Sequence, residues 1–131
     1  MKTPWKTLER LEPDSEYLVL ATRLPPLGRS STLRLARGAG QVRKQLSKTD
    51  GVMGFSLVAR PWRKDYATLS VWRSDEALDA FVAQEPHAAL VASLSPLLAP
   101  TTFVRWTMQG SEGKPSWTDA FRRMDASQRE A

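Results

Sequence analysis

The chain has 131 residues, a mass of 14.7 kDa and a net charge of +5. Its length predicts one domain over residues 1–131. It has no cysteine, which excludes disulfides, thiolate catalysis and cysteine-ligated metal, and its single histidine leaves too few ligands for a zinc or di-iron centre. The sequence shows neither a signal peptide nor a membrane span, so we expect a cytoplasmic protein.

The positive charge raises the question of nucleic acid. Lysine and arginine are spread along the chain, and the densest clusters lie at residues 60–64 and at Arg43, Lys44 and Lys48. Neither cluster matches a nucleic-acid motif. We therefore favour a solvated basic face over a nucleic-acid interface.

The first half of the chain predicts a strand, a long helix and a second strand. A polar lead-in over residues 1–16 is followed by 16–24, which is rich in strand-forming residues and ends at two prolines. A serine-capped helix then extends to Gly51. Residues 52–60 alternate as a strand, which places one set of side chains on a common face: Met53, Phe55, Leu57 and Ala59.

The second half predicts two more strands with helices after each. Residues 66–72 form a strand in a hairpin with the preceding one. Ser74 caps a helix with an acidic first turn, and Pro86 begins a second helical segment. A fourth strand follows at 101–108. Four side chains share one face of the third strand: Tyr66, Thr68, Ser70 and Trp72.

The resulting order is β-α-β-β-α-β with an additional C-terminal helix over 114–128. This order predicts an α+β, ferredoxin-like fold with an antiparallel four-stranded sheet. With helices on one face only, the other face would be bare and apolar. A second copy that covers this face is the simplest remedy, so we expect a homodimer.

Two stretches resemble a known superfamily: "TLSVWRSDEALDAFVAQEPH" at residues 68–87 and "VRWTMQGSEGKPSWTDAFRRM" at residues 104–124. They are similar to the dimeric α/β-barrel superfamily, which contains antibiotic-biosynthesis-type monooxygenases and haem-degrading monooxygenases. The likeness is strongest to the spheroidene-monooxygenase-like and uncharacterised barrel families, and it covers roughly residues 17 to 124.

The resemblance implies a barrel of two facing sheets, with a ligand pocket between the sheet and the helices of each subunit. Cofactor-free members oxidise aromatic polyketides with Asn, Trp, Tyr and Arg, whereas haem-degrading members use an Asn, a Trp and an axial His. This chain contains no asparagine. Phe81 stands where the haem-degrading members carry a helix Trp, and His87 falls a few residues before their axial His.

His87 and Trp72 are the candidate catalytic residues. His87 could act as a base or proton donor to a bound substrate, or it could pack at a helix start. Trp72 could wall the pocket and orient a ligand through its indole N–H, or it could plug the junction between sheet and helix.

Four further residues are candidates for substrate binding. Tyr66 and Ser70, with Thr68 between them, would form a semi-polar lining if their face looks toward the helices, and would only pack if it looks outward or into the dimer. Phe81 is a candidate because the resemblance places it where haem-degrading members carry a helix Trp. Arg105, a charge within an apolar strand, could hold an anionic ligand group or pair with an acid such as Asp65 across the dimer.

Together these features predict a monooxygenase-like protein that acts on a lipophilic or aromatic small molecule without metal or flavin. One alternative is a non-catalytic dimeric barrel that binds a small ligand. A second alternative is a haem-dependent oxygenase with His87 as the axial ligand.

Overall fold

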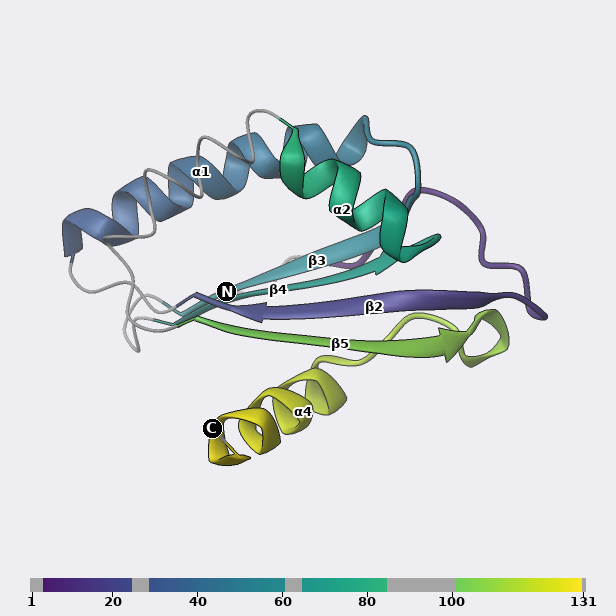
Figure 1. The fold of residues 1–131 in the computed structure, drawn as a ribbon. Helices are drawn as coiled ribbons and strands as arrows, with labels where there is room; N and C mark the ends of the chain where they lie inside the picture. Colours follow the sequence, from purple (N-terminus) through teal and green to yellow (C-terminus); the bar gives the residue numbers. More distant parts are fainter. Residues whose placement is uncertain (1–3, 25–28, 61–64, 85–100, 131) are drawn as a thin grey trace.

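The computed structural model describes residues 4–24, 29–60, 65–84 and 101–130, and Figure 1 shows their arrangement. The elements follow the predicted order, with a two-residue strand at the start and a short 3-10 turn before the last helix. Their bounds are β1 (Lys6–Thr7), β2 (Glu16–Arg23), α1 (Arg29–Ser47), β3 (Val52–Arg60), β4 (Asp65–Trp72), α2 (Asp75–Ala83), β5 (Thr102–Gln109), η3 (Gly110–Glu112) and α4 (Trp117–Glu130). The helical segment predicted to begin at Pro86 lies outside the described residues.

The strands form one sheet in the order β1-β3-β4-β2-β5, with every neighbouring pair antiparallel. Without β1 this is the ferredoxin-like order, so the predicted α+β fold is confirmed. The polar lead-in adds β1 as a fifth strand, with Lys6 opposite Phe55. The indole of Trp5 lies against Gly54, where an added Cβ would come within 2.7 Å of the ring. A side chain at that position would push the lead-in off the sheet.

A bulge near the start of β3 changes which way its side chains point. Val52 lies opposite Trp72 and Gly54 lies opposite Val71, so Met53 is an extra residue in the ladder. Met53 belongs to the buried cluster on one side of the sheet, whereas Phe55 belongs to the cluster on the other side. The prediction that Met53 shares a face with Phe55 is therefore wrong, because simple alternation does not foresee the inserted residue.

Helices α1 and α2 cover one face of the sheet (Figure 1). The hydroxyl of Ser74 accepts a hydrogen bond from the backbone N–H of Ala77 at 3.2 Å, which caps α2 as predicted. Gly51 joins α1 to β3 at φ 93°, and a Cβ there would approach the Ala77 Cβ to 2.6 Å. Glycine therefore lets α2 lie close to this turn. The buried cluster beneath the two helices contains Leu18, Leu46, Val52, Phe55, Trp72, Leu78 and Phe81.

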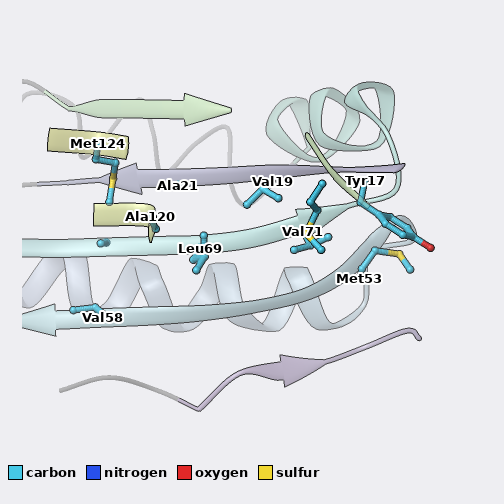
Figure 2. Close-up of a cluster of buried hydrophobic side chains, with 11 residues drawn as sticks. Tyr17, Val19, Ala21, Met53, Val58, Leu69, Val71, Ala120 and Met124 are labelled. Carbon is cyan, nitrogen blue, oxygen red and sulfur yellow. The ribbon is translucent and has the colours of Figure 1, made fainter. Parts of the chain in front are cut away.

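The opposite face of the sheet is covered by α4, so the expectation of a bare face is wrong. Ala120 and Met124 of α4 are fully buried against Val19 and Leu69 (Figure 2). Three polar contacts hold the helix in place: the Trp117 indole N–H donates to Ser56 Oγ at 3.1 Å, Arg23 pairs with Asp125 at 2.9 Å, and Gln128 donates to Thr102 at 3.0 Å.

The outward side of α4 is polar. Asp119 pairs with Arg122 and Arg123 along the helix, and the guanidinium of Arg123 lies 4.4 Å from the centre of the Trp106 ring. These contacts make α4 a helix with one side on the sheet and the other suited to water. The chain itself thus supplies a cover that the sequence assigned to a second subunit.

Candidate functional site

Trp72 ends β4 and points into the layer beneath α1 and α2. It is 1% exposed, and its indole N–H donates to Ser70 Oγ at 2.8 Å. The ring lies 5.1 Å from that of Phe81 in a tilted arrangement. The structure therefore brings three of the predicted site residues together. Because the indole N–H already has a partner, Trp72 acts as the packed junction between β4 and α2.

A row of hydroxyl-bearing side chains continues from Ser70 along the same face of the sheet. Tyr66 and Thr68 follow at alternate positions of β4, and Thr22 of β2 lies directly opposite Thr68. Tyr66, Ser70 and Thr22 are buried and Thr68 is half-buried. We call Thr22, Tyr66, Thr68 and Ser70 the hydroxyl row. Sequence analysis missed Thr22, although a threonine directly after the apolar segment 17–21, still within the predicted strand, is the signal that could have found it.

The phenol of Tyr66 is the titratable member of the hydroxyl row. Burial raises its pKa above the ordinary value, because a phenolate would be poorly solvated there. Among the residues that the structure describes, none forms a hydrogen bond with this hydroxyl. Tyr66 is thus held as a neutral phenol, which can donate a hydrogen bond but is a poor base at neutral pH.

Arg105 lies on the helix-facing side of the edge strand β5, opposite Leu20. Its guanidinium is paired with two acids of α2, Asp75 at 3.3 Å and Asp79 at 3.5 Å. Arg105 therefore pairs with acids of its own chain, and the expected pairing with an acid such as Asp65 across the dimer stays a prediction. The side chain of Arg105 is 45% exposed, so these ion pairs link β5 to α2 at a position that water reaches.

His87 lies outside the described residues, so its proposed role as a base stays a prediction. Within the described part of the chain, no group of three or more His, Asp or Glu residues could hold a metal ion. The described candidates therefore divide into two sets. Trp72, Ser70, Tyr66 and Phe81 share the helix-facing layer, and Arg105 lies at its edge.

Solved structures of other proteins share this architecture. SnoaB, a cofactor-independent oxygenase from Streptomyces nogalater, superposes with a TM-score of 0.60 at 14% identity, over 72% of this chain and 95% of that chain. A candidate antibiotic-biosynthesis monooxygenase from Deinococcus radiodurans gives 0.60 at 10% identity, over 68% and 89%. The chain therefore shares the fold of these two proteins. A candidate monooxygenase from Fusobacterium nucleatum gives a TM-score of 0.66 at 10% identity, over 80% of this chain and 47% of that one.

The antibiotic-biosynthesis-monooxygenase fold confirms the resemblance seen at residues 68–87. No family model matches the sequence, and no curated protein matches it. Identities of this size establish the fold alone. None of the helices in the described ranges is long and apolar enough to cross a membrane.

Proposed function

We propose that this protein binds a lipophilic or aromatic small molecule between β4 and the layer of α1 and α2, and that it oxidises this molecule as a monooxygenase without metal or flavin. The observation that carries the proposal is the hydroxyl row. The row places hydroxyl groups beside the aromatic pair Trp72 and Phe81, and this mixture of polar and apolar side chains suits a ligand that has polar atoms. The fold shared with SnoaB supports the type of reaction.

Each side chain of the layer has a distinct part in this proposal. Trp72 and Phe81 form the apolar end of the proposed site, and an aromatic ring of the ligand would pack against them. Tyr66 donates a hydrogen bond to an oxygen of the substrate, because it stays protonated at neutral pH. His87 is proposed as the base. Arg105, which is ion-paired with α2, would hold this helix at the edge of the site. It would contact an anionic group of the ligand only through the exposed part of its guanidinium.

The proposed reaction needs a substrate with an acidic carbon, such as a methylene group flanked by aromatic and carbonyl groups. Loss of a proton gives a stabilised carbanion that passes electrons to molecular oxygen. One oxygen atom remains on the carbon as a carbonyl, and the other leaves as water with the two hydrogens of the methylene. The protein would contribute orientation, a proton acceptor and a hydrogen-bond donor.

A non-catalytic ligand-binding protein is the second candidate. The observation in its favour is the Trp72–Ser70 hydrogen bond, because it removes the indole N–H from the groups that could act on a substrate. The haem alternative depends on His87 and stays a prediction, as does the cytoplasmic location.

The homodimer also stays a prediction, and α4 changes what it requires. A partner copy would meet the polar outer side of α4, or it would pack beside α4 on the half-buried residues Val104, Trp106 and Phe121. Light scattering coupled to size-exclusion chromatography distinguishes a mass near 14.7 kDa from twice that mass.

Oxygen uptake tests the proposal. The protein is mixed with anthrone-like and hydroquinone-like compounds, and oxygen consumption and product mass are followed. We expect turnover by the native protein and a loss of about tenfold or more in Tyr66→Phe. Tyr17→Phe is the matched control, because Tyr17 lies on the α4 side of the sheet. Ligand-induced thermal stabilisation without oxygen uptake would favour the non-catalytic candidate, and neither response would contradict both.

A further inference from the structure

A groove of about 880 Å³ opens between the C-terminal half of α1 and α2, apart from the hydroxyl row. Its floor contains Ala77, Ala80 and Phe81 of α2. One wall is the side of α1 that carries two lysines and two glutamines, and the turns at both helix ends close the groove. The α1 residues in the lining are Gln41, Lys44, Gln45 and Lys48.

The basic wall belongs to the most strongly charged stretch of the sequence. Between residues 17 and 49 there are seven Lys and Arg residues and no acid, whereas the rest of the chain has twelve bases and fourteen acids. The whole positive charge of the protein therefore comes from α1 and its flanking residues. A helix C-terminus favours a basic last turn, but this preference does not explain the complete lack of acids along the helix.

The orientation of α1 presents this charge outward. Val42 and Leu46 pack against the cluster that contains Trp72, whereas Arg37, Lys44 and Lys48 are exposed. Spacings of seven and four residues place these three cations along one side of the helix. The apolar side of α1 is occupied by the sheet, so it is not available to enter a membrane.

The arginine and the lysines that line the groove differ in whether an acid pairs with them. Arg73, at the end near α2, is paired with Asp50 and Glu9, and the Arg73 hydrogen bond is the main reason why the pKa of Asp50 is lowered. Within the described residues, Lys44 and Lys48 have no acidic partner. The groove thus combines an apolar floor with lysines whose charge is not neutralised locally.

We propose that this groove docks an acidic amphipathic segment of a partner protein. Apolar side chains of the segment would contact Ala77, Ala80 and Phe81, and its carboxylates would face Lys44 and Lys48. A polyphosphate chain fits less well, because it has no apolar side for this floor. The groove shares Phe81 with the layer proposed to bind the small molecule, but the docking itself needs no oxidation chemistry.

Fluorescence anisotropy with the purified full chain tests the docking. The probe is a fluorescein-labelled helical peptide built of leucine and glutamate. A peptide of the same charge without leucine, a single-stranded DNA oligonucleotide and vesicles of phosphatidylglycerol are compared with it. We expect saturable binding of the leucine–glutamate peptide at physiological salt, and clearly weaker binding of the other three.

Two variants separate the two parts of the groove. Lys44→Glu with Lys48→Glu reverses the charge of the wall and is expected to weaken peptide binding about tenfold or more. Ala80→Arg fills the floor and adds positive charge, so it is expected to weaken peptide binding although it would strengthen a purely electrostatic association. The control, Arg10→Glu with Lys114→Glu, changes net charge by the same amount at exposed positions outside the groove and is expected to change affinity less than about twofold.

Three results would overturn the proposal. The first is no binding of the leucine–glutamate peptide. The second is equal or tighter binding of the DNA or the vesicles, which would make the α1 surface a site for polyanions. The third is unchanged peptide affinity in Ala80→Arg, which would show that the floor takes no part. Circular dichroism of each variant confirms that the fold is retained.

Discussion

The two faces of one sheet are built from the same strands, yet they are filled differently. On the α4 side, alternate residues of β2 and β4 such as Val19, Leu69 and Val71 are fully buried beneath Ala120 and Met124. On the α1 and α2 side, the apolar end at Trp72 gives way to the hydroxyl row. The α4 face is mostly apolar and its buried hydroxyl, Ser56, is hydrogen-bonded to Trp117 of the covering helix, which stabilises the fold. The other face buries the hydroxyl row, where we propose the ligand site.

The largest effect is expected at the junction of the helix-facing layer. Trp72→Ala removes the ring that packs on Phe81 and leaves the hydroxyl of Ser70 without its donor. We expect a loss of about 3–5 kcal/mol in the free energy of unfolding, together with loss of ligand binding. Urea denaturation followed by circular dichroism measures the stability, and thermal shift with a bound ligand measures the binding. A loss below about 1 kcal/mol would contradict the role of Trp72 as the packed junction.

The α4 face is expected to respond in stability alone. Met124→Ala empties a fully buried position between α4 and the sheet, which is expected to cost about 2–5 kcal/mol without changing ligand affinity at a temperature where the variant is folded. Arg122→Ala on the exposed side of α4 is the control, with an expected change below about 1 kcal/mol. Reduced ligand affinity in Met124→Ala would show that the two faces are coupled and that their division is wrong.

What the sequence predicted and what it missed follow the same division. Alternation and helix signals place β2 to β5 and the two capped helices, because these are local properties of the chain. The bulge at Met53 and the short strand β1 depend on pairing with residues that are distant in the sequence. The alternation of polar and apolar residues along one strand therefore predicts neither of them. The amphipathic pattern of α4 shows only that one side of the helix is apolar. It does not show which face of the sheet this side covers.

The candidate site was predicted in the same uneven way. Trp72 and Ser70 were placed on one face because alternation along a strand is a local property, whereas Phe81 was a candidate through the resemblance alone. Thr22 was missed because its closeness to Thr68 comes from the pairing of β2 with β4, which are distant in sequence. The pairing of Arg105 with Asp75 and Asp79 depends on how α2 lies next to β5, which the sequence does not show, and both outcomes suggested for Arg105 stay predictions.

The two buried tyrosines offer a smaller test of the comparison. The hydroxyl of Tyr17, on the α4 side, accepts a hydrogen bond from the backbone N–H of Glu12 at 2.8 Å. Tyr17→Phe is expected to cost about 1 kcal/mol because that N–H loses its partner. Tyr66→Phe is expected to cost less in stability and more in ligand affinity. Chemical denaturation and ligand titration of both variants check this, and the reverse ranking would place the site on the wrong face.

The smallest effect is expected at alkaline pH. Burial holds the pKa of Tyr66 above its ordinary value of 10.0, so the folded state keeps a proton that the unfolded state loses. The contribution is therefore fully present below about pH 10 and is lost as pH rises through the folded pKa, because the unfolded state then binds fewer protons. The native protein should lose stability above about pH 10, as the pH rises toward the folded pKa, more steeply than Tyr66→Phe. All other ionisable groups are common to both proteins, so the difference between the two slopes of unfolding free energy against pH, each point measured by urea denaturation, isolates Tyr66. Parallel slopes would mean that the phenol is already exposed to water, and a solvated phenol would leave the helix-facing layer without its buried hydrogen-bond donor.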